Sequence, residues 1–440
     1  MGELIPKLCF FYLLRKTNFQ AVHLFKLCPL KQRYYSLDVF RGATVCLMIL
    51  VNNPGSWSHI YGPLEHAPWH GLTPTDLVFP FFLFAVGNAM AFVMPRLAEA
   101  GDGVFWRKVI KRSLLIFAIG LFLNWWPFFR WQENHLEFIS WTWTTTDASG
   151  VTKVNGVRIL GVLQRIALCY FFASIIVYYL KARGAFLVGL ILLLLYWLLC
   201  YGGNPADPYS LEGWFGTDID KMILHDAHMY KGEGVVFDPE GLMSTIPAIV
   251  QVILGYLVGD YILKRTKLAV AAENPSQTPA INPLYQILTG LFIAAMAFLL
   301  AGYMWSLEFP VNKKIWTSSY VIVTTGMATA ILATMIYAIE IKGTRNWLTR
   351  FFDVFGKNAL FVFALSAFLP KGLRLIRIPN GMNTKGEPVY ISPWNWIYER
   401  VYKFVPGAPE IGSLLFALTV ILFMWAICYW LDKKRIYIKV

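Results

Sequence analysis

The chain has 440 residues, of which 57% are hydrophobic and only 15% are charged. A soluble domain has about 25% charged residues, so this composition excludes an ordinary soluble protein and indicates an integral membrane protein. The formal net charge of +13 would suit a nucleic-acid-binding protein, but the basic residues lie in short segments between apolar runs. That distribution is typical of membrane topology, and we expect no nucleic-acid partner.

Ten apolar stretches approach or exceed the length that crosses a lipid bilayer. They are long and continuous, and do not alternate in short segments, so they predict helices and not strands. We therefore expect an all-α polytopic membrane protein, a bundle of about ten transmembrane helices with aromatic-rich outer loops. The expected helices are 37–53, 73–94, 111–128, 157–180, 184–201, 242–263, 284–305, 317–340, 356–372 and 411–431.

Two segments suggest how the chain is divided. Residues 1–33 hold only a short apolar run and no small-residue cleavage site, so we expect a cytoplasmic N-terminal extension and not a signal peptide. The polar segment 268–283 is expected to be a cytoplasmic linker between a first membrane half, 34–267, and a second half, 284–440. The candidate active site falls in the first half. The six cysteines form no CxxC pair and are expected to be buried core residues.

Lysine and arginine set the expected orientation, because they are enriched in cytoplasmic loops. Alternate connections are basic, and these place both termini in the cytoplasm, although the last outer loop, 371–410, also contains basic residues. Two outer segments, 124–146 and 393–407, are rich in tryptophan. These tryptophans form either an interfacial aromatic belt or stacking platforms for sugar rings. The basic connections are 95–113, 181–183, 264–267, 342–350 and the C-terminal DKKR.

His66 and Asp76 lie ten residues apart at the outer end of the second expected helix, and Asn52 ends the first. The loop between these helices is short, so all three residues are expected near one membrane face. A neutral histidine beside a carboxylate is a common general base, and an asparagine could donate to an oxyanion. Alternatively, Asp76 caps the helix and His66 is an interfacial loop residue. Ionisable groups at the edge of a membrane span are functional candidates, because burying them is costly.

Further polar residues occur near other helix ends. Asp38 and Arg41 are spaced to form an ion pair on one helix face, or could contact a ligand. Arg158 is expected to reach outward, and Arg165 is expected about two turns inside a helix that starts at 157. There it could attract an anionic cofactor or pair with a buried acid. His225 and His228 have no third partner fixed by the sequence, and we expect no metal site.

Seven motifs occur in the order found in the heparan-α-glucosaminide N-acetyltransferases and their bacterial relatives. The chain resembles that family over roughly 34–440. The motifs are SLDVFRG, LMILVNNPG, EHAPWHGLTPTDLVFPFF, RILGVLQRIALCYF, DPEGLMSTIPAIV, FPVNKKIWTSSYV and FGKNALFVF.

The resemblance implies transfer of an acetyl group from cytosolic acetyl-CoA to the amine of a terminal glucosamine on the far side of the membrane. It implies His66, Asn52 and Asp76 as catalytic residues. The candidates for binding acetyl-CoA are Arg41, Arg107, Lys108, Lys111, Arg112, Gln164 and Arg165. The candidates for binding the sugar are Trp69, Asp238, Glu240, Asn312, Lys313 and Trp316.

The luminal N-terminal domain of the lysosomal enzyme has no counterpart in this sequence. We therefore expect a multi-pass protein of a bacterial inner membrane, with its active site toward the periplasm and the lipid bilayer and an amino sugar as partners. A homodimer is compatible with this pattern. Two other functions fit the sequence: an amino-sugar transporter, and an acyltransferase for another periplasmic glycan.

Overall fold

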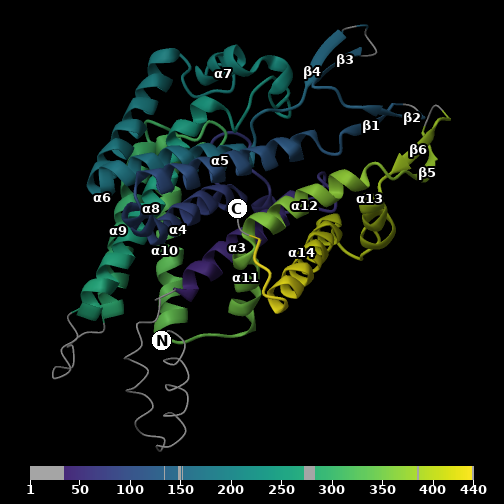
Figure 1. Ribbon diagram of the computed structural model, residues 1–440. Helices are drawn as coiled ribbons and strands as arrows, with labels where there is room; N and C mark the ends of the chain where they lie inside the picture. Colours follow the sequence, from purple (N-terminus) through teal and green to yellow (C-terminus); the bar gives the residue numbers. More distant parts are fainter. Residues whose placement is uncertain are drawn as a thin grey trace, which may run out of the picture. The chain divides into compact units, whose positions relative to one another are not determined.

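The computed structural model describes residues 34–132, 134–146, 150, 152–271, 283–383 and 386–438, and residues Ser36–Val440 form one compact unit. The expected N-terminal extension and most of the expected linker lie outside the described residues. Both remain predictions, as does the division into two membrane halves. The described chain is mostly helical (Figure 1).

Seven of the described helices are long and apolar enough to cross a membrane, and the number is eight if the bent pair α11–α12 counts as one span. The two members of that pair meet at 79°. The long elements are α3 (Tyr35–Asn52), α4 (Val78–Ala100), α5 (Asp102–Trp125), α6 (Val162–Gly203), α8 (Leu242–Ala271), α9 (Pro283–Ser306), α10 (Ser318–Ile336), α11 (Trp347–Lys357), α12 (Ala359–Leu373) and α14 (Pro409–Lys433). Shorter elements in the connections are α7 (Gly216–Leu224) and α13 (Pro393–Ile397).

The expected number of ten spans is not confirmed, and two elements account for the difference. The stretches 157–180 and 184–201 fall in the 42-residue element α6, in which two helices meet at a kink at Lys181, where φ is +56°. This element counts as one candidate span. Helix α5 covers residues 111–125 of the expected stretch 111–128, but its first half is basic, so it is not apolar enough to count as a span.

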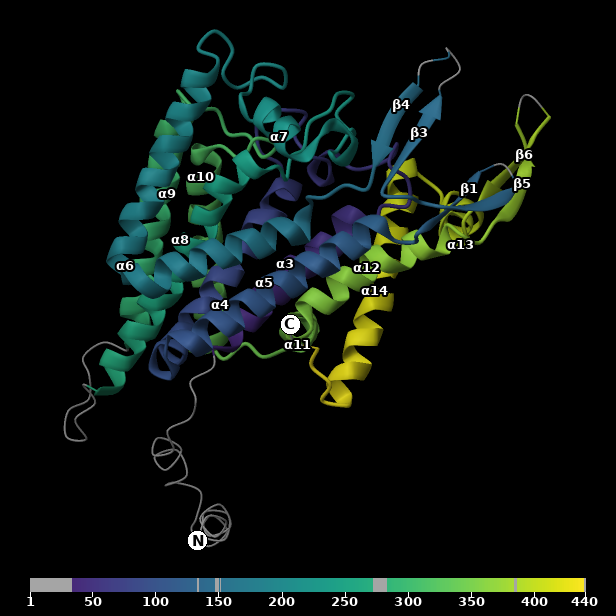
Figure 2. The ribbon, with the colours of Figure 1, turned by 45° about the horizontal axis from the view of Figure 1, so that its top comes forward.

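The expectation of an all-α protein is wrong in the outer loops, which contain three antiparallel hairpins. Short runs such as TWTTT and PVYI have the β-branched and aromatic residues that strands favour, but a search for long apolar runs overlooks them. The hairpins β1–β2 and β5–β6 lie side by side near α13 (Figures 1 and 2), and Trp131 Nε1 donates to the Leu375 carbonyl at 2.9 Å. The strands are β1 (Phe129–Gln132), β2 (His135–Phe138), β3 (Thr142–Thr146), β4 (Thr152–Gly156), β5 (Ile378–Met382) and β6 (Pro388–Ile391).

Helices α4 and α8 pack so closely that their backbones nearly touch. A Cβ atom added to Gly87 would lie 2.0 Å from the Val252 carbonyl oxygen, and one added to Gly255 would lie 2.2 Å from that of Phe84. Small residues permit such close approach between apolar helices. The contact matters for the site because α4 begins just after Asp76 and α8 begins just after the 238–240 segment.

The loops expected on the outer side gather at one end of the bundle. Trp69 Nε1 donates to the Tyr209 carbonyl at 2.8 Å, which joins the loop after α3 to the loop after α6. Lys314, from the loop after α9, forms an ion pair with Glu233 at 2.5 Å. The Gly55 amide donates to the Ser413 carbonyl at 3.2 Å. These loops therefore share one face, and which face of a membrane this is remains a prediction.

We predict that Gly87→Ala destabilises the protein, because the added methyl group meets backbone atoms that cannot move aside without separating α4 from α8. The melting temperature in detergent should fall, with a free-energy cost of about 1–3 kcal/mol. Gly103→Ala is the matched control, since nothing lies within 4 Å of its added Cβ. Equal melting temperatures for the two variants would contradict the tight crossing.

Candidate active site

Asp76 is buried where the loop after α3 enters the second span. It lies in the 3-10 turn η2 (Pro74–Leu77), and only 1% of its side chain is exposed. Its Oδ2 atom accepts hydrogen bonds from the amides of Ala67 and Thr73, both at 3.1 Å, and from the Thr73 hydroxyl at 3.0 Å. Its Oδ1 atom lies 2.7 Å from His66 Nδ1. Asp76 thus caps the turn and also holds the histidine, the two roles that the sequence left as alternatives.

His66 is held by Asp76 through one of its two ring nitrogens. The ionised carboxylate of Asp76 can only accept hydrogen bonds, so Nδ1 carries the proton in their contact and Nε2 keeps a lone pair. The histidine side chain is 49% exposed. A histidine oriented in this way can take a proton from a substrate or attack an electrophilic carbon.

Lys313 adds a positive charge from the loop between α9 and α10. Its Nζ atom lies 3.0 Å from His66 Nδ1, 3.2 Å from Nε2 and 3.6 Å from Asp76 Oδ1. Burial lowers the pKa of Lys313, and the negative charges of Asp76 and Glu240 oppose that shift. The resemblance placed Lys313 among the sugar ligands, but its contacts in the structure are to the histidine and the carboxylate.

Two neighbours of Lys313 shape its loop. The Oδ1 atom of buried Asn312 accepts from the amides of Lys314 at 2.7 Å and Ile315 at 3.1 Å, as is usual for asparagine in turns. Trp316 is 1% exposed and packs edge-on against Tyr320. These contacts favour a positioning role for Asn312 and Trp316, whose expected contact with sugar is still a prediction.

The carboxylates of the DPEG segment are held by Arg158. This guanidinium donates to both oxygens of fully buried Asp238, at 3.0 and 2.5 Å, and to Glu240 at 2.5 Å. Burial opposes ionisation of Glu240, but the charges of Arg158 and Arg165 outweigh it and lower the pKa of Glu240. Two carboxylates thus hold Arg158 against the 238–240 segment, and its outward direction relative to a membrane remains a prediction.

Arg165 is fully buried in the first turn of α6, not two turns inside, because the helix begins at Val162. Its guanidinium contacts the Ser244 hydroxyl and lies 5.0 Å from the Trp316 ring centroid. Its Nε and Nη1 atoms have no hydrogen-bond partner among the described residues. Gln164 is also buried and donates to the Ile159 carbonyl at 3.0 Å. Both residues therefore lie near the loop end of α6.

Asn52 is not joined to the His66–Asp76 pair by any hydrogen bond within the part of the chain that the structure describes. Its carboxamide donates to the Met48 carbonyl at 2.8 Å, within its own helix. One N–H of its carboxamide is not used by this bond, and its catalytic role remains a prediction.

Some of the expected acetyl-CoA ligands are exposed, and others already contact other groups of the protein. Arg107, Lys108 and Lys111 are exposed on the first half of α5, and Arg112 stacks on the Tyr170 ring at 4.7 Å. Arg41 is engaged, because it pairs with Asp38 at 2.8 Å and donates to the Gly356 carbonyl. Helix α4, with 23 residues, extends about 34 Å at ~1.5 Å per residue, so the basic turns after it are roughly one helix length along the chain from Asp76.

A cleft of about 430 Å³ adjoins the loop that carries His66. That volume is in the range of small-molecule sites. Its lining combines aromatic, acidic and imidazole side chains: Trp69, His70, Asp207, Tyr209 and Glu233. Burial lowers the pKa of His70, which keeps this ring neutral.

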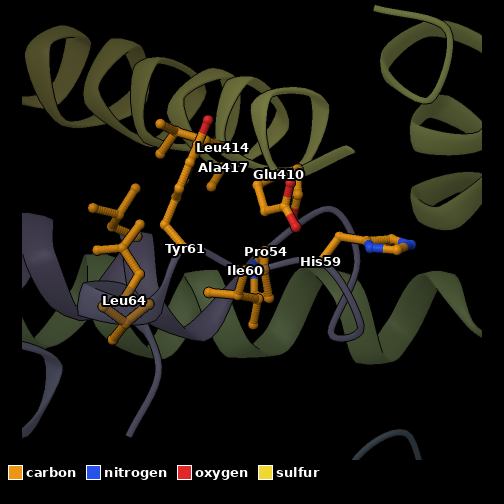
Figure 3. Close-up of a pocket in the computed structure, with 11 residues that line it drawn as sticks. Pro54, His59, Ile60, Tyr61, Leu64, Glu410, Leu414 and Ala417 are labelled. Carbon is orange, nitrogen blue, oxygen red and sulfur yellow. The ribbon is translucent and has the colours of Figure 1, made fainter. Parts of the chain in front are cut away.

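A second cavity lies between the 54–64 loop and α14 (Figure 3). Its volume of about 20 Å³ holds one water molecule and no sugar. The residues labelled in Figure 3 that form its mainly apolar walls are Pro54, Ile60, Tyr61, Leu64, Leu414 and Ala417.

The apolar helices and the loop-borne site describe a multi-pass membrane protein. No family model matches the chain. The chain is 28% identical to human heparan-alpha-glucosaminide N-acetyltransferase over 392 residues, which cover 77% of this chain and 53% of the human protein. The mouse protein of the same name is 26% identical over 385 residues, which cover 75% and 53%. The chain spans about half the length of these curated relatives, and the matches support a relative of that family.

Asp220 is a buried carboxylate that the sequence analysis did not single out. Its Oδ1 atom accepts from the Leu242 amide at 2.9 Å at the start of α8, and its Oδ2 atom has no partner among the described residues. Burial raises the pKa of Asp220 from 3.8 to about 7, although the backbone amides oppose the shift. Folding therefore favours the protonated acid, and the stability this provides is lost as the pH rises from about 4 through 7.

We predict that Asp220→Asn removes this pH dependence. An asparagine can keep the bond to Leu242 and stays neutral, so at pH 8 the variant should be more stable than the wild type, by about 2–4 kcal/mol at ~1.4 kcal/mol per pKa unit. Thermal unfolding in detergent between pH 5 and 8 measures this. A wild-type melting temperature that does not fall over that range, or an equal fall in the variant, would contradict the raised pKa of Asp220.

Proposed function

We propose that this protein is a transmembrane N-acetyltransferase that moves the acetyl group of cytosolic acetyl-CoA to the amine of a glucosamine or related amino sugar on the outer side. The observation that carries the proposal is the His66–Asp76 pair at 2.7 Å, set in a chain similar to two proteins named as N-acetyltransferases. Acyl transfer to an amine needs a base or nucleophile, and the Nε2 atom of the half-exposed histidine can supply either.

His66 acts in one of two ways. It takes the proton of the amine while the amine attacks the thioester carbonyl, or it attacks first and carries the acetyl group. In both routes a bond to the carbonyl carbon forms, the carbon–sulfur bond breaks, and the CoA thiolate leaves and is protonated. In the second route the amine then attacks the acetyl group on His66, the carbon–Nε2 bond breaks, and the amine loses a proton. Asp76 stabilises the imidazolium that forms when Nε2 takes a proton.

The cleft beside the site is the proposed entry for the acceptor sugar. Trp69 and Tyr209 offer aromatic surface, and Asp207 and Glu233 offer carboxylates for hydroxyl or ammonium groups. Because Trp69 is three residues after His66, a sugar in this cleft lies close to the exposed Nε2. Of the expected sugar ligands, Trp69 has the position that best supports this role.

The acetyl donor is proposed to approach from the opposite end of the bundle. The exposed cations Arg107, Lys108 and Lys111 are available for phosphate groups, whereas Arg41 is occupied by Asp38. The thioester would then have to reach along the bundle toward His66. Arg112 lies about 15 Å along α5 from the start of that helix, at ~1.5 Å per residue.

The prediction that tests this function concerns His66. In liposomes loaded with acetyl-CoA, the wild-type protein should acetylate radiolabelled glucosamine outside and release an equal amount of CoA inside. His66→Ala should lower the rate by about 10²–10⁴-fold, because it removes the base. Its melting temperature should change little, since the side chain is half-exposed.

His59→Ala is the matched control, an exposed histidine on the same loop. It should keep the wild-type rate. Uptake of sugar into the liposomes without consumption of acetyl-CoA would contradict this proposal and support an amino-sugar transporter. A fully active His66→Ala protein would show that the transfer uses another residue.

A further inference from the structure

Lys313 has an unusual position over the imidazole of His66. Its Nζ atom is almost equally distant from the two ring nitrogens, at 3.0 and 3.2 Å. An ammonium in the ring plane at such distances would overlap the ring, so Nζ lies over the imidazole face. It therefore does not occupy the in-plane direction in which the Nε2 lone pair points.

The loop holds Lys313 in this position. Asn312, next in the chain, receives two backbone amides at its Oδ1 atom, and Thr317 hydrogen-bonds to the Asn312 amide at 3.0 Å. On the other side of the site, the Tyr320 hydroxyl donates to the Asp76 carbonyl at 2.6 Å, which joins α10 to the η2 turn. The lysine and the histidine are thus fixed to each other through neighbouring backbone.

We propose that Lys313 is a catalytic residue that binds the carbonyl oxygen of the acetyl group as it becomes negatively charged. This inference rests on the proposed acetyl transfer. Whether the amine or His66 Nε2 attacks, the carbonyl carbon lies beside Nε2 during the reaction. The π electron pair moves to the oxygen, which can turn from the ring plane toward Nζ. When the carbon–sulfur bond breaks, that pair returns to the carbonyl and the thiolate leaves.

Charge favours this role over sugar binding. The carbonyl oxygen gains negative charge next to His66 as the bond to the carbonyl carbon forms, and a cation fixed beside it stabilises that charge. Only 20% of the Lys313 side chain is exposed. A protonated amino sugar would be repelled by the same cation, so Lys313 favours the neutral amine, which is the form that attacks. Asn52, expected to be the oxyanion donor, donates one N–H to the Met48 carbonyl, and its role as a second oxyanion donor remains a prediction.

Two reactions separate this role from a sugar contact. Both acetyl transfer to glucosamine and slow hydrolysis of acetyl-CoA without acceptor pass through the same oxyanion. Lys313→Met should lower kcat for both by about 10²–10³-fold, as for loss of an oxyanion donor, with little change in KM for the sugar. Lys403→Met is the matched control, an exposed lysine paired with Glu399, and it should behave as the wild type.

A chemical rescue distinguishes the loss of the lysine cation from misfolding of the variant. Lys313→Cys should be as slow as Lys313→Met. Treatment with 2-bromoethylamine, which rebuilds an ammonium side chain, should raise the rate of the cysteine variant by about tenfold or more, because it returns the cation to the oxyanion. Treated wild-type protein is the control.

A rise in the KM for sugar with hydrolysis unchanged would make Lys313 a sugar ligand and overturn the proposal. Wild-type rates in Lys313→Met, or no rescue of the cysteine variant, would also overturn it. A wild-type protein with neither transfer nor hydrolysis would overturn the proposed function itself, which is a separate result.

Discussion

The carboxylate of Asp76 accepts hydrogen bonds from four donors, and the arrangement of the site depends on these bonds. Three donors come from the backbone and hydroxyl of the loop and turn, and the fourth is the imidazole of His66. A buried carboxylate left without these donors would be costly. The loop after α3 therefore has little freedom, and the orientation of His66 follows from the folding of the turn at the start of α4.

The remaining helices place other charges around this pair. The α4–α8 crossing keeps the start of α4 near the 238–240 carboxylates, since Gly87 and Gly255 allow the two backbones to approach. Both carboxylates form ion pairs with Arg158, and the negative charge of Glu240 also acts on Lys313. A site with this many buried charges is stable only as a connected network, because the loss of one partner leaves another charge uncompensated.

The sequence predicted those parts of the site that are close together along the chain. His66 and Asp76 are separated by ten residues, so a short loop was enough to infer that they meet, and the spacing of Asp38 and Arg41 predicted their ion pair. Lys313 lies 247 residues from His66, and no local pattern reports such a contact. The motif resemblance flagged this lysine but not its partner. The hairpins were missed because strands of four or five residues give no long apolar run. The expected number of spans is not confirmed, because the two helices that meet at Lys181 count as one element, α6, and α5 is not apolar enough to count as a span.

The central claim is that Asp76 fixes the tautomer of His66 for acyl transfer, and Asp76→Asn tests it most directly. An asparagine oxygen can still accept from Ala67 and Thr73, but its amide group facing Nδ1 would place the proton on Nε2 and remove the lone pair. The measurement is the rate of acetyl transfer from acetyl-CoA to glucosamine, with the melting temperature recorded on the same sample. We predict a loss of about 10³–10⁴-fold, similar to the effect of the equivalent change in a serine-protease triad, with a small change in melting temperature. A folded Asp76→Asn protein that transfers acetyl groups at the wild-type rate would contradict the claim.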